Sequence, residues 1–137
     1  CTVPAAGKPT FALGDDEMEV GVGIHGEPGR RRARIAAADE IAETMLGAML
    51  VDLSPPPGAP CLLLVNGFGA TPLMELYLMV HAARRILQAR SVQVIRHLTG
   101  SLVTSLDMAG CSLTVTVLDD RIIRLWDAPV RTAALSW

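Results

Sequence analysis

The sequence predicts an α/β fold in a single compact domain, with helices packed on a mixed β-sheet. The 137 residues fit one domain and leave little room for two. Half of the residues are hydrophobic and 19% are charged, which provides enough apolar side chains for a packed core. Along the chain, helix and strand patterns follow the order strand, helix, strand, helix and three strands, which favours a mixed sheet.

The first elements are an irregular entry, a strand and a helix. Residues 1–16 contain two prolines and two glycines, and we expect no regular structure there. Residues 18–24 alternate between apolar side chains and small or polar ones, which predicts a half-buried strand. A tight loop at residues 25–29 ends it. In residues 35–52, Ile41, Met45 and Met49 recur at four-residue spacing, which predicts a helix with one apolar stripe.

The later elements follow a proline-rich surface connection at residues 54–60. The unbroken apolar run at 61–66 is typical of a central strand covered on both faces. Thr71 as N-cap and Pro72 at the first helical position predict a helix from 72 to about 89. Further strands are expected at 92–98, continuing through or restarting at 101–106, and at 112–118 and 121–126. Asp119-Asp120 would join the last two as an antiparallel hairpin.

Composition and spacing exclude several classes of protein. Twelve basic against fourteen acidic residues leave no excess of positive charge for a dedicated nucleic-acid binder. Apolar runs break well before the roughly 18 residues of a membrane span, and the N-terminus is not a signal peptide. Cys1, Cys61 and Cys111 are widely spaced, so neither a metal site nor a disulfide framework is expected. A cytoplasmic location is the default. The missing initiator Met suggests a fragment or a processed product.

His25 is the candidate site residue. It closes a strand whose same face carries only Gly21 and Gly23, so space remains beside the imidazole or another backbone comes close. A mostly neutral imidazole can act as a nucleophile or a base. Spacing alone also allows a purely structural histidine. His81 and His97 have no metal-ligand spacing and are interpreted as packed or solvated side chains.

Other motifs carry weaker signals. The turn at residues 67–71 opens a helix and could hold an anion, but it is not a phosphate-binding P-loop. The glycines at 21, 23 and 26 have the spacing of a dinucleotide-binding motif, but they lie within and just beyond the predicted strand, and Pro28 is unsuited to the helix that such a motif begins. The arginines at 30–32 and 34 are interpreted as a solvated surface, with an acidic partner or a phosphorylated ligand as the alternative. Polar residues near 101–107 resemble a catalytic triad in composition only, and we interpret them as polar surface on a strand: Ser101, Thr104, Ser105 and Asp107.

Several segments together resemble one family. The most specific is the run Gly23-Ile24-His25-Gly26-Glu27-Pro28-Gly29, and the others occur in the same order along essentially the whole chain. The chain is similar to the dihydroxyacetone-binding K domain of dihydroxyacetone kinases, and specifically to its second, C-terminal half. Residues 30–60 depart from the family pattern and look shortened. The segments that carry the resemblance are 1–9, 17–29, 66–77, 104–110 and 125–130.

The resemblance implies a role for His25 and a set of partners. In the family this histidine adds to the ketone carbonyl and forms a covalent hemiaminal, which holds the substrate for phosphoryl transfer. The chain itself would bind no cofactor and no metal, because ATP or ADP with Mg sits on a separate L domain or subunit. The N-terminal half of the K domain, with the other substrate contacts, is absent. A homodimer is implied.

Three hypotheses follow from the sequence. The first is the substrate-binding part of a kinase for dihydroxyacetone or a similar short ketose, inactive alone, with His25 as covalent anchor. The second is a non-catalytic ketose sensor or regulatory paralogue. The third is a truncated gene or proteolytic product with no independent function.

Overall fold

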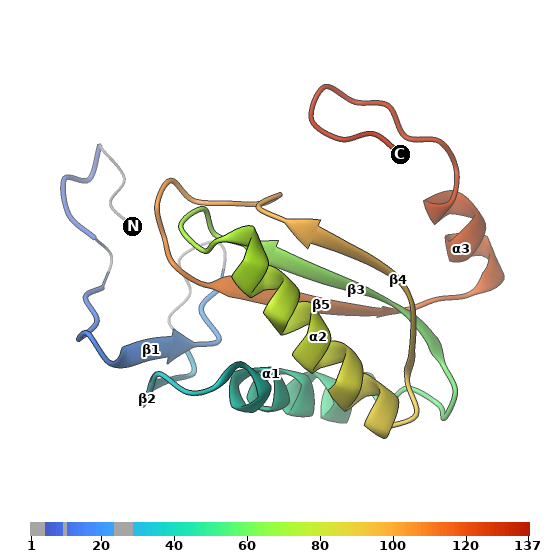
Figure 1. The fold of residues 1–137 in the computed structure, drawn as a ribbon, viewed down its shortest axis with the longest axis horizontal. Coiled ribbons are helices and arrows are strands. Elements are labelled where there is room, and N and C mark those ends of the chain that lie inside the picture. The colour runs from blue at the N-terminus through green and yellow to red at the C-terminus, as the bar shows by residue number, and fades with distance from the viewer. Residues whose placement is uncertain (1–4, 10, 24–28) are drawn as a thin grey trace.

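A computed structural model describes residues 5–9, 11–23 and 29–137, and it has the predicted α/β architecture (Figure 1). The elements in order are β1 (Glu17–Val20), β2 (Arg31–Arg34), α1 (Ala38–Leu53), β3 (Pro60–Gly67), α2 (Leu73–Ala89), β4 (Gln93–Gly100), β5 (Cys111–Val117) and α3 (Asp120–Trp126). Residues 5–9 and 11–16 contain only turns, bends and irregular backbone. Within the described part of the chain, no helix combines the length and hydrophobicity that a membrane crossing requires.

The main sheet has three strands in the order β4-β3-β5. β3 pairs with β4 in parallel, with α2 as the crossover between them, and with β5 in antiparallel orientation. The sheet is therefore mixed, as predicted. β1 and β2 form a separate antiparallel hairpin.

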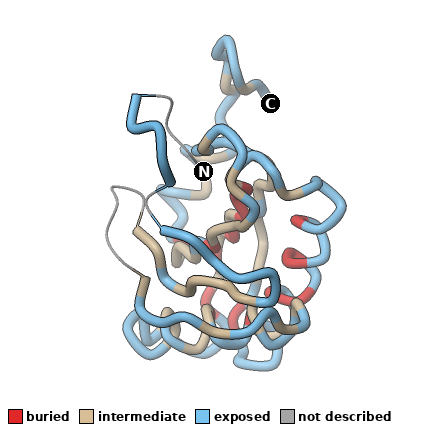
Figure 2. Tube along the Cα trace, turned by 90° about the vertical axis from the view of Figure 1, so that its left-hand side faces the viewer, coloured by how far each residue is buried: buried red, intermediate tan, exposed pale blue. Residues whose placement is uncertain are grey.

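The core lies between the sheet and the two long helices. Cys61, Leu63 and Val65 point from β3 toward the helices and are fully buried. Ala42 and Leu46 of α1 and the inner face of α2 close the same cluster, which confirms the predicted apolar stripe of α1. Figure 2 shows buried positions only in this body, whereas the C-terminal segment is exposed.

Only one face of the sheet is covered by helices among the described residues. Leu62 and Leu64 alternate with the buried positions of β3, remain half-buried and lie outside the core cluster. The expectation that β3 is covered on both faces is therefore wrong for this part of the chain. The physical reason is the chain path: α1 and α2 pack on the same side, and α3 follows β5 away from the sheet (Figure 1).

Three other predictions need correction. β1 ends at Val20 because Gly21 adopts a φ of +80°, so the predicted strand at 18–24 is shorter. β4 ends at Gly100, and residues 101–110 form a loop with no strand in it. The predicted strand at 121–126 is the helix α3, because Asp119 is not a turn residue but an N-cap whose carboxylate accepts the Ile122 N–H at 2.7 Å.

The C-terminal arm, which we define as α3 with residues 127–137, projects from the body (Figure 1). Trp126 and Trp137 stack with ring centroids 5.1 Å apart, and the Trp137 indole N–H donates to the Trp126 carbonyl. Arg96 of β4 joins this arm to the sheet through two hydrogen bonds to Asp127, at 2.8 and 2.7 Å. The arm is thus held by its own contacts and by the Arg96–Asp127 ion pair.

Candidate functional site

The β1–β2 hairpin carries the candidate residue His25 in its connection. Residues 21–30 join the two strands, and the backbone N–H of Arg30 donates to the Val20 carbonyl at 2.7 Å, which closes the base of this connection. His25 lies in the segment 24–28, outside the described residues. Its predicted role therefore stays a prediction, while the strands that hold the two ends of the connection are defined.

Glycines stand at both ends of this connection where side chains would not fit. Gly21 has a φ of +80°, and a Cβ there would lie 2.8 Å from the Arg30 side chain. A Cβ on Gly29 would overlap the side chain of Glu19. Left-handed backbone is unfavourable for other L-residues, so Gly21 lets the chain turn where it leaves β1.

The arginines beside His25 form a strand, which sequence reasoning did not anticipate. Arg31–Arg34 is β2, and it pairs residue by residue with β1. Arg32 Nε lies 3.2 Å from Glu19 and Arg34 lies 2.8 Å from Asp16. The signal available in the sequence was the match of an acidic strand to a basic one, since cross-strand charge pairs stabilise a hairpin modestly.

A second structured region lies where the parallel strands β3 and β4 end. Residues 68–72 and 101–110 follow these carboxyl ends, and backbone hydrogen bonds join them, such as Ala70 N–H to the Met108 carbonyl at 3.2 Å. In Figure 1 this loop pair and the β1–β2 hairpin both lie on the left-hand side of the molecule. In open α/β sheets, ligands bind beyond the carboxyl ends of the parallel strands.

Asn66 organises this loop pair, and sequence reasoning missed it. It is only 4% exposed, and its Oδ1 accepts the backbone N–H groups of Leu102 and Val103 at 2.9 and 2.8 Å. Its Nδ2 donates to the Val103 carbonyl at 2.7 Å. A polar amide ending an otherwise apolar run is the signal that could have identified it, because buried amides are almost always fully hydrogen-bonded.

Thr71 and Ser105 complete the loop pair. The Thr71 hydroxyl accepts the Gly110 N–H at 2.8 Å and lies 3.0 Å from the Gly110 carbonyl, to which it donates. It therefore does not cap α2, whose N-cap position is Pro72. The Ser105 hydroxyl donates to the Phe68 carbonyl at 2.7 Å and accepts the Met108 N–H. These hydroxyls hold the loops together, so the polar residues near 101–107 do not lie on a strand face but shape a loop.

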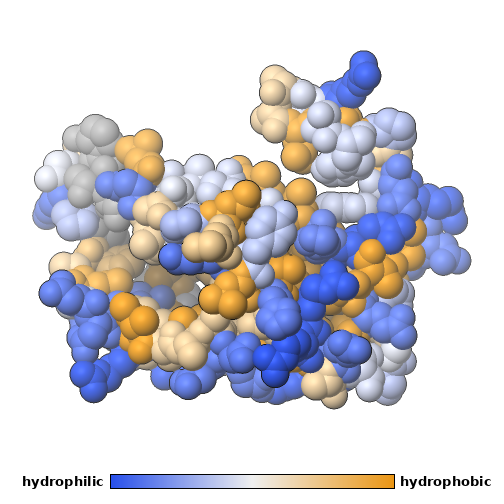
Figure 3. Space-filling view, viewed as in Figure 1, coloured by the Kyte–Doolittle hydropathy of each residue, from blue (hydrophilic) through white to orange (hydrophobic). Residues whose placement is uncertain are grey.

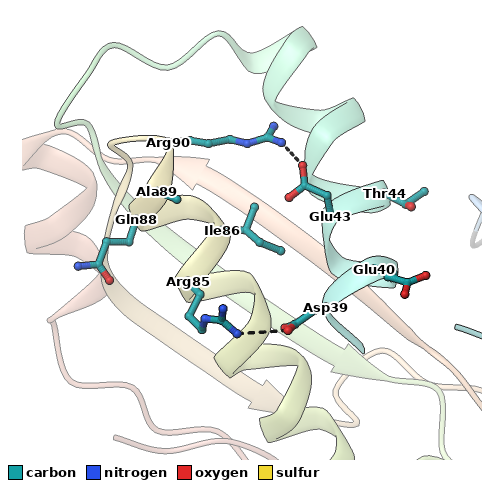
Figure 4. Close-up of a pocket in the computed structure, with 9 residues that line it drawn as sticks. All are labelled: Asp39, Glu40, Glu43, Thr44, Arg85, Ile86, Gln88, Ala89 and Arg90. Atoms are coloured by element: carbon teal, nitrogen blue, oxygen red, sulfur yellow. Dashed lines mark hydrogen bonds and ion pairs between the residues drawn. The ribbon is translucent and has the colours of Figure 1, made fainter. Parts of the chain in front are cut away.

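Two hollows flank α1. One, of about 900 Å³, lies between α1 and α2 and is spanned by the ion pairs Asp39–Arg85 and Glu43–Arg90 (Figure 4). The two ion pairs occupy both arginines of this groove, which leaves no basic side chain of its lining unpaired for an anionic ligand. The other, of about 450 Å³, lies between β2 and the start of α1 and is closer to the hairpin. Glu40 and Thr44 line both.

The other sequence candidates do not add to the site. His81 on α2 and His97 on β4 are exposed. Among the residues that the structure describes, no three His, Cys, Asp or Glu side chains gather as a metal site would require. Cys61 and Cys111 are free thiols, and burial raises the pKa of each above its usual value. Their chemistry is therefore suppressed at neutral pH.

Comparison with known proteins gives a consistent result. The Dak1 domain family matches residues 1–134. The dihydroxyacetone-binding subunit DhaK of the PEP-dependent dihydroxyacetone kinase of Escherichia coli K12 is 41% identical, over all of this chain and 45% of its own. D-erythrulose kinase of Mycolicibacterium smegmatis is 40% identical, over 98% of this chain and 23% of its own. The chain thus spans less than half of the length of these relatives.

A solved structure shares the fold as well as the sequence pattern. The dihydroxyacetone kinase operon co-activator DhaQ superposes with a TM-score of 0.81 at 33% identity, over 93% of this chain and 40% of its own. One fold thus occurs both in a kinase subunit and in a protein described as a co-activator.

Proposed function

We propose a function from one premise: the chain belongs to the Dak1 domain family. It is the ketose-binding part of a dihydroxyacetone kinase, and residues 1–137 form the C-terminal half of the substrate-binding K domain. The observation that carries the proposal is the 41% identity to a dihydroxyacetone-binding subunit over the whole chain. The positive φ of Gly21, where the His25 connection begins, supports it, because the chain leaves β1 there through a conformation that favours glycine.

His25 is the covalent anchor in this proposal. A ring nitrogen adds its lone pair to the ketone carbon, and the C–N bond forms as the carbonyl π bond breaks. The carbonyl oxygen takes up a proton and the other ring nitrogen releases its own, so the hemiaminal is neutral and no group leaves. A neutral imidazole is the reactive form, which favours neutral to alkaline pH.

Covalent capture explains selection of the substrate. Glycerol has no carbonyl carbon, so His25 cannot bond to it, whereas every short ketose offers one. The bond also fixes the hydroxyl that receives the phosphoryl group, and phosphoryl transfer depends mainly on such positioning. D-erythrulose kinase among the relatives supports short ketoses as the substrate class, with dihydroxyacetone as the first candidate.

The remaining chemistry belongs to partners. ATP or ADP with Mg binds a separate L domain or subunit, and the N-terminal half of the K domain supplies the other substrate contacts. The chain alone therefore captures ketose but does not transfer phosphate. It acts in the cytoplasm and pairs as a homodimer.

Carbon-13 NMR with dihydroxyacetone labelled at its carbonyl carbon tests the capture. We expect the carbonyl signal to move from the ketone region to that of a tetrahedral carbon, and the intact mass to rise by one ketose. His25→Ala abolishes both changes. His81→Ala and His97→Ala are matched controls, because these histidines are exposed, and both retain them.

Two results would contradict the role of His25. One is capture that survives His25→Ala and is lost in a control variant. The other is turnover, restored by an L partner and the missing half, whose rate His25→Ala leaves unchanged.

The likeness to the co-activator DhaQ favours one alternative, a non-catalytic ketose sensor. Capture by His25 suits both functions, so reconstitution separates them. A kinase part gains turnover when the missing half and a nucleotide-loaded L partner are added. A sensor captures ketose equally well but yields no phosphorylated product under the same conditions.

A further inference from the structure

Glu19 of β1 lies at the base of the connection that carries His25, and its side chain is largely covered although the hairpin is exposed. Only 16% of the Glu19 side chain is exposed, against 39% for Glu17, which lies on the same face of the same strand. In Figure 3 hydrophilic surface gathers at the lower left, where Figure 1 places this hairpin. A carboxylate turned away from solvent needs contacts that offset its desolvation, and these contacts indicate its role.

The two carboxylate oxygens of Glu19 have different neighbours. Oε2 accepts a hydrogen bond from Nε of Arg32, at 3.2 Å across the strand pair. Oε1 lies against Gly29, in the place that a Cβ on this glycine would occupy. Arg32 therefore holds one side of the carboxylate, while the other side contacts the backbone just before β2 begins.

The other end of the connection is closed in a reciprocal way. The Arg30 side chain lies over Gly21, where a Cβ would be 2.8 Å from Cγ of Arg30. The backbone N–H of Arg30 also donates to the Val20 carbonyl at 2.7 Å. Each side of the hairpin thus lays one side chain across the glycine of the other side. We call Glu19, Gly21, Gly29 and Arg30 the hairpin neck.

The neck matters because a nucleophile must be held in place to bond to its substrate. Glycine has no side chain that restricts its backbone, so the position of Gly29 depends on the contact with Glu19. Misplacement of a reacting group by about 1 Å can remove much of the advantage of a bound reactant. We propose that Glu19 is a positioning residue for ketose capture: its carboxylate, held by Arg32, fixes Gly29 and with it one end of the His25 connection. This inference rests on the proposed function, because capture by His25 is the event that the neck serves.

Two substitutions of Glu19 separate the reach of its side chain from its charge. Glu19→Gln keeps the length and one oxygen acceptor but loses the charge, whereas Glu19→Asp keeps the charge but is one methylene shorter and withdraws from Gly29. The equilibrium constant of capture is measured by carbon-13 NMR with dihydroxyacetone labelled at its carbonyl carbon. We expect it to fall about tenfold in Glu19→Ala and in Glu19→Asp, and to stay within about twofold in Glu19→Gln. An ion pair that only stabilises the hairpin predicts rescue by aspartate instead.

Glu17→Ala is the matched control. Glu17 lies on the same face of β1 and also faces Arg32, at 3.7 Å, but it is two residues further from the connection. We expect its substitution to leave ketose capture unchanged. Glu17→Ala and Glu19→Ala should shift the unfolding midpoint by similarly small amounts, because surface ion pairs contribute little to stability. A loss of capture in Glu19→Ala alone is then not a loss of the fold.

Gly29→Ala tests the same contact from its other side. The added Cβ displaces the Glu19 carboxylate and changes no charge. Gly29→Ala should therefore weaken capture about as much as Glu19→Ala, and the double variant should be no weaker than either, because both substitutions remove one contact. Amide hydrogen exchange without ketose gives an independent measurement. The Arg30 N–H should exchange faster in Glu19→Ala than in Glu17→Ala, because only Glu19 belongs to the neck.

Three outcomes overturn the positioning role of Glu19. They are unchanged capture in Glu19→Ala, rescue by aspartate and not by glutamine, and additive losses in the double variant with Gly29→Ala. Capture that persists in the Glu19 variants but disappears in His25→Ala contradicts the positioning role alone. Absence of capture in the unaltered chain contradicts the proposed function, and the positioning role falls with it.

Discussion

The side chain of Asn66 and the backbone of Val103 exchange two hydrogen bonds, Nδ2 to the Val103 carbonyl at 2.7 Å and the Val103 N–H to Oδ1 at 2.8 Å. The amide of Asn66, one residue before the end of β3, thus pairs with the backbone that follows the end of β4. It fixes the start of the 101–110 loop against the end of β3.

Asn66→Ala should lower the free energy of unfolding by about 2–4 kcal/mol, because the backbone N–H groups of Leu102 and Val103 lose their partner in a buried place. Urea unfolding with an unchanged m-value measures it. Ser112→Ala is the control, since Ser112 makes only a 3.5 Å contact with Asn66 and should matter much less. Equal effects of the two substitutions would contradict the role of Asn66.

Gly21→Ala should destabilise the protein by about 1–2 kcal/mol, because alanine is strained at a φ of +80°. It should also weaken ketose capture, since Gly21 begins the connection that carries His25. Gly47→Ala is the matched control: Gly47 lies in α1 with open space around its Cβ position, so the same substitution should stabilise by about 0.5–1 kcal/mol. Thermal unfolding measures the stability of each variant, and NMR of labelled ketose measures its ketose capture. Destabilisation by both substitutions would contradict the strain argument.

Arg96 lowers the pKa of Asp127 below its usual value of 3.8, first through the side-chain hydrogen bond. The carboxylate is therefore charged more readily in the folded arm than in the unfolded chain. The contribution of this pair to stability is fully present above pH 3.8 and is lost as the pH falls through the lowered pKa. An NMR titration of the Asp127 carboxyl carbon should show this shift, and Arg96→Gln should abolish it. Arg121→Gln, on exposed α3, should leave it in place.

Burial raises the pKa of the Cys61 and Cys111 thiols above the usual 9.0. The folded state holds the thiol protons more tightly than the unfolded chain does. The two thiols therefore leave the free energy of unfolding unchanged below pH 9 and lower it as the pH rises beyond 9. Alkylation at pH 8 should be much slower for both thiols in the folded protein than in denaturant, as measured by peptide mass spectrometry. Rapid reaction of Cys61 in the folded protein would contradict its complete burial.

The elements that periodicity defines well were predictable from the sequence. The stripe of Ile41, Met45 and Met49 predicted α1, and the apolar run at 61–66 predicted β3 in the centre of a mixed sheet. In both cases the local pattern and the packing of the core demand the same structure. The His25 motif likewise stood out, although its segment lies outside the described residues.

The errors arose where local signals were ambiguous. Residues 121–126 are too short for periodicity to separate a strand from a helix, and the N-cap hydrogen bond of Asp119 decides the outcome. The arginines of β2 have no apolar alternation, because their partner is an acidic strand and not the core. Asn66 could not be recognised as a loop organiser, because the residues that it holds are 36 and 37 positions away in the chain.

The stacked pair of Trp126 and Trp137 contains both tryptophans of the chain. Tryptophan fluorescence, excited selectively, therefore reports on the C-terminal arm and not on the sheet or the hairpin. A change in tryptophan emission on denaturation would report unfolding of the arm. Unfolding of the sheet with α1 and α2 must therefore be followed by circular dichroism or amide exchange. Conversely, a coincident transition by both signals would show that the arm and the body unfold as one unit.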